Sequence, residues 1–179
     1  MKHTRLLPRE HESTRRLWYR NFFVFSCFRG CLIWLVVATA ACAPAPQTSN
    51  TPVAGSAMSA GVIDPYLKIS AALADDSTEG VRAHAGEIAT ASTSLGAPAM
   101  KIDTAALQLA SFGDIEDART KFGVLSEALD NYMTGLKLTP PEGVKVAFCP
   151  MVSKPWMQQG DTLANPYYGK DMLSCGSFR

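Results

Sequence analysis

The apolar residues between positions 64 and 137 recur every three or four residues, which is the period of an α-helix. The strongest repeat follows Asp114, a residue type that caps helices. Its apolar members are Ile115, Ala118, Phe122, Leu125, Leu129, Tyr132 and Leu136. Such a stripe is typical of core packing. The pattern therefore predicts a long helix that ends near Lys137.

Three shorter helices are predicted before this one. Asp64-Pro65 is a start signal, because Asp caps a helix and Pro is tolerated at its first position. Asp76 and Glu79 form a capping-box pattern for the second helix. The apolar positions of that helix are Val81, Ala85, Ile88 and Leu95. A third helix is predicted over residues 102–112, and four helices with short connections favour an up-down bundle.

The pattern changes after "TPPEG" at residues 139–143. "VKVAF" alternates and is β-branched, so it predicts a short strand, and "DMLSCGSF" is its expected partner. That pairing would bring Cys149 and Cys175 within bonding distance, on either side of a turn at "NPYYG". The predicted fold is therefore mainly α: an up-down four-helix bundle with a small C-terminal β or irregular lobe, residues 144–179, closed by two cysteines.

The N-terminal segment has the features of an export signal. Residues 1–41 combine a basic leader with an apolar stretch that is too short to span a bilayer comfortably. "TAAC", ending at Cys42, resembles the bacterial lipobox, in which the cysteine is lipidated; the alternative is ordinary cleavage at Ala38-Thr39-Ala40. Residues 42–63 are rich in Pro, Ala, Ser and Thr and predict a flexible tether. The folded domain is then residues 64–179.

Charge and histidine content limit the classes of function that we expect for this protein. From Cys42 onward there are ten Lys and Arg residues and fourteen Asp and Glu residues, a net charge of 10 − 14 = −4. A weakly acidic domain without a basic stripe argues against nucleic acid as a partner. His84 is the only histidine after Cys42, and no nucleophile is arranged with it. We therefore do not expect an enzyme.

Five sulfur-containing side chains in the tail are candidate ligands. They are Cys149, Met151, Met157, Met172 and Cys175. Thiolates and thioethers prefer soft cations, so the expected ion is Cu(I) or Ag(I). The alternative is a disulfide between Cys149 and Cys175, since paired cysteines are usual in exported domains, and the methionines would then fill the core.

The tail also carries a family resemblance. "ARTKFGVLSEAL" on the fourth helix is followed by "FCPM", "WMQ", "NPYYG" and "MLSCG". In this order the segments resemble a family of small exported bacterial domains of unknown function, which occur alone or fused to periplasmic adaptor subunits of copper and silver efflux systems of the resistance-nodulation-division type. The resemblance covers residues 64–178 and implies heavy-metal handling as the context.

Two functions follow from the sequence. One is a membrane-tethered periplasmic accessory protein in copper or silver efflux or tolerance, with soft metal bound through Cys and Met and an efflux adaptor or another metal-handling protein as partner. The alternative is a non-catalytic structural or interaction module with a structural disulfide and no metal site. A third and weaker reading is a binder of a small hydrophobic ligand in the bundle.

Lipidation of Cys42 would place the protein on the periplasmic side of a membrane. We expect the outer membrane, because Ala43 follows the cysteine rather than an acidic retention residue. Labelled palmitate should enter the wild-type protein and should not enter Cys42→Ser. Equal labelling of the two proteins would show that Cys42 is not the lipid site.

Overall fold

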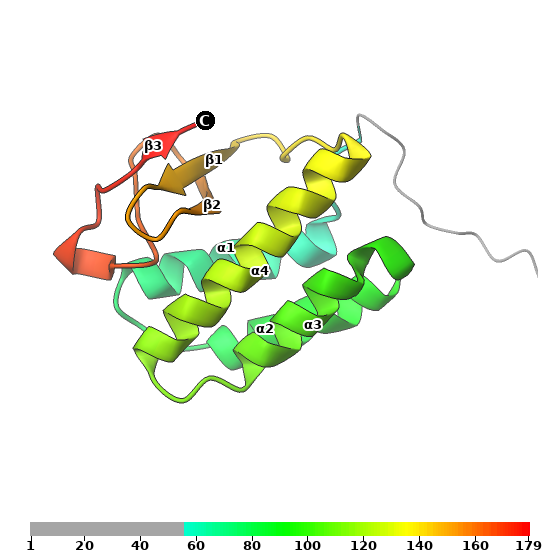
Figure 1. The fold of residues 1–179 in the computed structure, drawn as a ribbon, viewed down its shortest axis with the longest axis horizontal. Coiled ribbons are helices and arrows are strands. Elements are labelled where there is room, and N and C mark those ends of the chain that lie inside the picture. Colours follow the sequence, from blue (N-terminus) through cyan, green and yellow to red (C-terminus); the bar gives the residue numbers. More distant parts are fainter. Residues whose placement is uncertain (1–55) are drawn as a thin grey trace, which may run out of the picture. The chain divides into compact units, whose positions relative to one another are not determined.

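Four helices and a small sheet make up the part of the chain that the computed structural model describes, residues 56–179 (Figure 1). The helices are α1 (Ala60–Ala74), α2 (Val81–Thr93), α3 (Met100–Ala110) and α4 (Ile115–Leu136). The strands are β1 (Val144–Cys149), β2 (Lys154–Gln159) and β3 (Ser177–Phe178), and two 3-10 turns are η1 (Ala97–Ala99) and η2 (Gly169–Asp171). The mainly-α prediction is confirmed. The predicted leader, the predicted lipidation site at Cys42 and the predicted tether as far as residue 55 lie outside the described residues.

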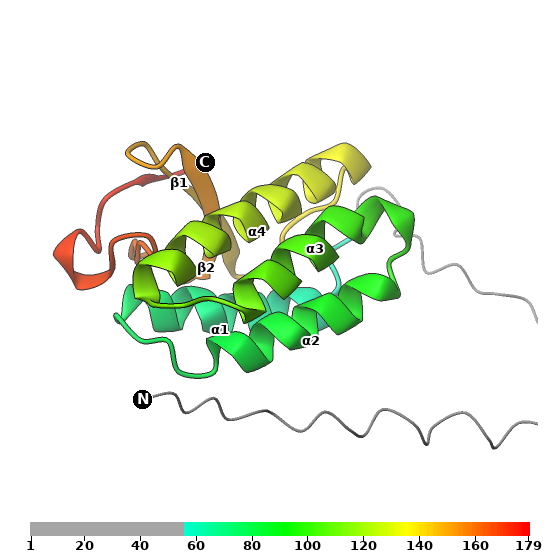
Figure 2. The ribbon, with the colours of Figure 1, turned by 60° about the horizontal axis from the view of Figure 1, so that its bottom comes forward.

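The helices pack in chain order, and the sheet joins their core. α1 packs against α2, α2 against α3 and α3 against α4, while β2 packs against both α1 and α4 (Figures 1 and 2). Ala147, Cys149, Trp156 and Met157 of the sheet belong to the same buried cluster as the helices. The C-terminal lobe is therefore part of a single core and is not a separate unit held together by its own cysteines.

The predicted stripe of α4 is confirmed. Asp114 caps the helix, because its carboxylate accepts the Asp117 N–H at 2.9 Å. Phe122, Leu125 and Leu129 are fully buried. The helix ends at Lys137, which adopts a left-handed conformation with φ of 55°.

The predicted start of the first helix, with Asp64 as cap and Pro65 as first residue, is wrong by five residues. α1 begins at Ala60, where the N–H groups of Val62 and Ile63 both donate to the Ser59 carbonyl. Pro65 lies inside the helix. Met58 is buried and its N–H donates to the Thr139 carbonyl at 3.2 Å. The end of the predicted tether is therefore folded, because these apolar side chains complete the core.

The predicted capping box before α2 is also wrong. Gly80, with φ of 71°, precedes the helix, and no side chain caps its N-terminus. Asp76 has φ of 59° and turns its carboxylate toward Arg119 of α4 instead. Asp76, which the sequence pattern predicts as a local helix cap, thus contacts a residue 43 positions away.

β1 is the central strand of the sheet, between β2 and β3. Its predicted partner is only partly correct, since the residues of that segment that pair with β1 are Ser177 and Phe178. The longer partner is β2, which pairs antiparallel with all of β1. The sequence of β2 does not predict a strand because it contains Pro155. A proline cannot donate a ladder hydrogen bond and is confined to edge strands. β2 is an edge strand here, so Pro155 is tolerated.

No helix within residues 56–179 is both long enough and apolar enough to cross a membrane.

Candidate functional site

The five predicted sulfur ligands do not form one cluster. Met157 is opposite Val146 and Cys149 is opposite Lys154 in the ladder. Val146 and Cys149 are three residues apart on β1, and alternate residues of a strand point to opposite faces. Cys149 and Met157 therefore lie on opposite faces of the sheet and cannot share an ion.

The remaining sulfur atoms differ in exposure. Met151 is 59% exposed and Cys149 is fully buried, while Met172 and Cys175 are half-buried. In residues 56–179, no group of three or more His, Cys, Asp or Glu side chains is placed to hold a metal ion. Met157 and Cys149 thus do not belong to one site, and a soft-metal site at the other predicted sulfur ligands stays a prediction.

Cys149 and Cys175 are free thiols, so the predicted disulfide is not formed. The side-chain amide of Asn165 bridges the two residues. Its nitrogen donates to Cys149 Sγ at 3.3 Å and to the Cys175 carbonyl at 2.7 Å. The ladder also continues toward Gly176, rather than Cys175, as the neighbour of Cys149. The prediction that the two cysteines lie in one region is confirmed, but the buried Asn165 amide that bridges them was not predicted.

Asn165 fixes the turn that follows it. Its side-chain oxygen accepts the Tyr167 N–H at 2.8 Å, and its backbone N–H donates to the Leu173 carbonyl at 2.7 Å. Its side chain is fully buried and every polar atom of it has a partner. Since a buried polar group is costly unless it is paired, this residue holds the segment 165–173 in one conformation.

Arg119 joins α4 to two other parts of the chain. Its Nη2 donates to the Asp76 carboxylate and to the Leu73 carbonyl at the end of α1, and its Nε donates to the Pro166 carbonyl at 3.3 Å. The side chain is 13% exposed. The Arg119 guanidinium, helped by the Lys170 N–H, holds the pKa of Asp76 below its usual range. The carboxylate therefore stays charged at neutral pH, and the contact persists.

Gly169 lies directly on this ion pair. Its φ is +56°, and a Cβ at this position would overlap the Asp76 carboxylate and the Arg119 guanidinium. The next residue, Lys170, donates its backbone N–H to Asp76 at 3.2 Å and pairs its side chain with Asp75 at 2.7 Å. The turn thus docks on the end of α1 only because position 169 has no side chain.

A groove of about 510 Å³ lies between α4 and the docked turn. Gly123 of α4, Val152 and the rings of Tyr167 and Tyr168 give it an apolar wall. Gly123 has no side chain, so the Tyr167 ring lies close to the α4 backbone at this position. A Cβ there would lie 3.4 Å from the ring. The volume is in the range of small-molecule sites.

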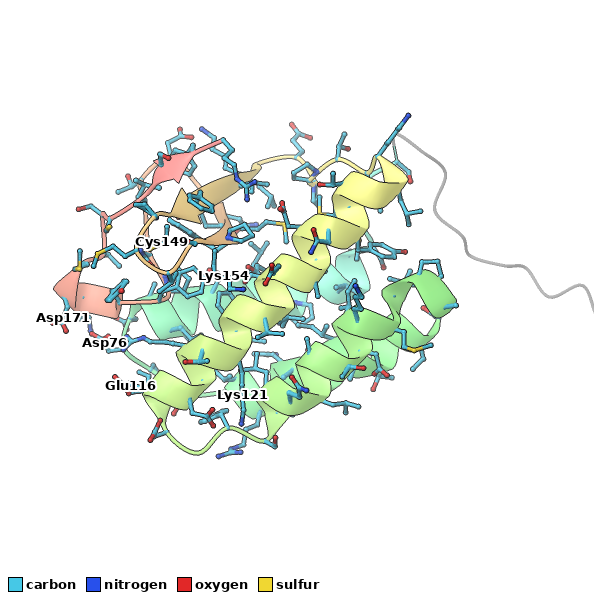
Figure 3. All side chains as sticks on the ribbon, viewed as in Figure 1. Asp76, Glu116, Lys121, Cys149, Lys154 and Asp171 are labelled. Carbon is cyan, nitrogen blue, oxygen red and sulfur yellow. The ribbon has the colours of Figure 1, made fainter. Side chains whose placement is uncertain are left out.

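Charged side chains line the rest of the groove. They are Glu116, Arg119, Lys154 and Asp171. Figure 3 shows Glu116 and Asp171 toward the end of the molecule that carries η2, and Lys154 nearer the middle of α4. Lys154 is paired with Glu127 of α4. Both acidic and basic groups therefore face the groove, at different places along it.

Aromatic rings connect this groove to the core. Tyr167 lies 5.9 Å from Phe122 and makes an edge contact with Trp156 at 6.1 Å, measured between ring centroids. Phe122 stacks on Tyr66 at 5.0 Å. Burial raises the pKa of Tyr66 and that of Tyr167 far above the usual value for a tyrosine. Both hydroxyls are therefore neutral and serve as hydrogen-bonding groups.

The sequence analysis missed the groove and the residues that build it. Arg119 reads as an ordinary polar residue of a helix, and its partner Asp76 is 43 positions away. "NPYYG" was recognised as a turn, but a turn is normally exposed, whereas Asn165, Tyr167 and Gly169 are buried. The aromatic pair in that motif was the one available signal.

Comparisons with known proteins return no relative of this chain. No protein-family model matches it, and neither a curated protein nor a solved structure does. The resemblance to exported domains of metal efflux systems stays a prediction.

Gly169→Ala should destabilise the protein far more than Gly160→Ala. Both glycines have positive φ, so each alanine incurs about 1 kcal/mol of backbone strain. A Cβ at position 160 meets no atom within 4 Å, whereas one at position 169 displaces the Asp76–Arg119 pair. Urea unfolding should show a loss for Gly169→Ala several times that for Gly160→Ala. Similar losses would mean that the turn does not depend on this contact.

Proposed function

We propose that the protein is a non-catalytic binding module of the cell envelope, tethered to a membrane through Cys42. Its binding site is the groove between α4 and the turn at residues 165–171. The four helices serve as the scaffold, in the up-down arrangement that the sequence predicts. The observation that carries the proposal is a groove of about 510 Å³ whose outer wall is docked onto the helices at several points.

The rigidity of that wall supports binding. Asn165 holds its start, the Tyr167 hydroxyl donates to the Pro155 carbonyl, and Gly169 lies on the Arg119–Asp76 pair. A wall fixed before the ligand arrives loses little conformational entropy on binding, which favours affinity.

The chemistry of the lining supports binding rather than catalysis. The two basic groups are in ion pairs, Arg119 with Asp76 and Lys154 with Glu127. The buried Tyr167 hydroxyl is engaged by a backbone carbonyl. Each of these groups holds the structure together, so the lining offers shape and charge to a ligand.

Filling the groove should abolish binding. Thr120 lines it, is exposed and donates to the Glu116 carbonyl at 3.0 Å. Thr104 on α3 is a matched control, since it is exposed and donates to the Met100 carbonyl at 3.0 Å. A mixture of aromatic amines, alcohols and carboxylates should shift the NMR amide signals of groove residues. Thr120→Trp should weaken that response at least about tenfold, which is 1.4 kcal/mol.

Thr104→Trp should bind as the wild type does, because its side chain lies outside the groove lining. Signal shifts that scatter over the surface, or that survive in Thr120→Trp, would contradict a binding function for the groove.

A second candidate is capture of Cu(I) or Ag(I) by the two free thiols in a metal-tolerance system. Its support is the Asn165 amide, which contacts Cys149 Sγ and the Cys175 carbonyl and so keeps both cysteines in one loop cluster. Thiolates are much stronger ligands for these ions than thioethers are. The ion would displace the amide from Cys149.

Metal capture can be tested with Cu(I) and a competing chelator on the reduced protein. The Cys149→Ser/Cys175→Ser variant should bind at least about a hundredfold more weakly, a difference of 2.7 kcal/mol. Met157→Leu is the control, since Met157 lies on the other face of the sheet and should bind as the wild type does. If the reduced wild type binds no better than the double variant, the tail has no metal site.

A further inference from the structure

We infer that the groove selects small amphiphilic monocations: an ammonium or related head attached to one aromatic or aliphatic body. This inference rests on the proposed binding function and specifies its ligand. The reason lies in which charges of the lining are already neutralised and which are not.

The positive charges of the groove are not available to a ligand. Arg119 donates to the Asp76 carboxylate and to two backbone carbonyls. Lys154 of β2 is paired with Glu127, which follows the groove residue Gly123 by one turn of α4. An anionic ligand would have to compete with these carboxylates for the same donors. The groove therefore offers little to an anion.

The negative charges at the η2 end are available. Among residues 56–179, no group donates a hydrogen bond to the Asp171 carboxylate. Glu116 is 74% exposed, and its nearest oxygen is 3.6 Å from Arg119 Nη1, beyond hydrogen-bonding distance. Asp171 therefore attracts a cation without losing a partner, and Glu116 gives up only an ion pair with Arg119 that is longer than a hydrogen bond. Figure 3 shows the two residues at the same end of the molecule, and both line the groove, so a cationic head in that end of the groove is attracted by both.

The apolar part of the groove lies next to these carboxylates. Glu116 and Gly123 are seven residues apart on α4 and both line the groove, which corresponds to roughly 10 Å along the helix axis. The rings of Tyr167 and Tyr168 and the side chain of Val152 line the same groove. A ring or short chain buried there loses its contact with water, which is favourable.

The ligand should carry only one positive charge. Lys154 lines the same groove as the apolar wall and lies away from the η2 end (Figure 3). A second cationic group on the body of the ligand would find no free carboxylate there, since Glu127 is already paired with Lys154. A diamine is therefore disfavoured relative to an amine with an apolar tail.

Three probes with the same body test this inference. They are 4-phenylbutylammonium, 4-phenylbutanol and 4-phenylbutanoate, titrated into the 15N-labelled protein at low salt. The ammonium should bind in the groove about 3- to 10-fold more tightly than the alcohol, the range expected from two exposed charge contacts. The carboxylate should bind most weakly, and the advantage of the ammonium should shrink as sodium chloride is added.

Two charge variants distinguish an effect of the carboxylates in the groove from an effect of the net charge of the protein. Glu116→Gln/Asp171→Asn should bring the ratio of ammonium affinity to alcohol affinity down to about one. Asp64→Asn/Glu142→Gln is the matched control, because it removes two exposed carboxylates away from the groove lining and should keep the preference. Equal binding of ammonium and alcohol, or an equal loss in the control variant, would overturn the cation selectivity while the groove remains a binding site. If none of the three probes shifts groove signals, the proposed binding function fails as well.

Discussion

The Tyr66 hydroxyl joins three elements of this fold, α1, α4 and β2. It lies 2.7 Å from the Ser126 hydroxyl of α4 and accepts the Met157 N–H of β2 at 3.2 Å, while its own backbone belongs to α1. An edge strand has one row of backbone groups without a ladder partner, and such groups cannot be buried unpaired without a large cost. β2 packs against helices along that edge. It can do so because Tyr66 supplies a partner for Met157 and Tyr167 supplies one for Pro155.

The groove results from the same packing of β2 against the helices. Tyr167 closes the edge of β2 with its hydroxyl and forms the apolar wall with its ring. Because its ring also packs against Phe122, the wall cannot move without disturbing the core. Arg119 and Gly169 then fix the far end of the same turn on α1. The shape of the site is therefore set by the contacts that stabilise the domain.

The parts of the fold that follow from local pattern were predictable, and those that depend on distant partners were not. The stripe of α4 predicts both the helix and the burial of Phe122, because a helical period leaves one face for the core. β2 was missed, since four successive buried residues beginning at Pro155 have no alternation. Asp76 resembled a cap because Glu79 follows it at the right spacing, but a guanidinium 43 residues away is a stronger partner than a local N–H.

The cysteines and the groove are coupled through Asn165. One face of this residue contacts Cys149 and Cys175, and its side-chain oxygen fixes the N–H of Tyr167, which lines the groove. Any event that takes the Cys149 sulfur, whether a soft cation or a bond to Cys175, removes one partner of the amide and leaves a buried polar group to find another. A shift of the Asn165 side chain would displace the Tyr167 N–H that it accepts, and would strain the packing of the Tyr167 ring on Phe122. Sulfur chemistry in the tail would therefore change the shape of the groove, even though no sulfur atom lines it.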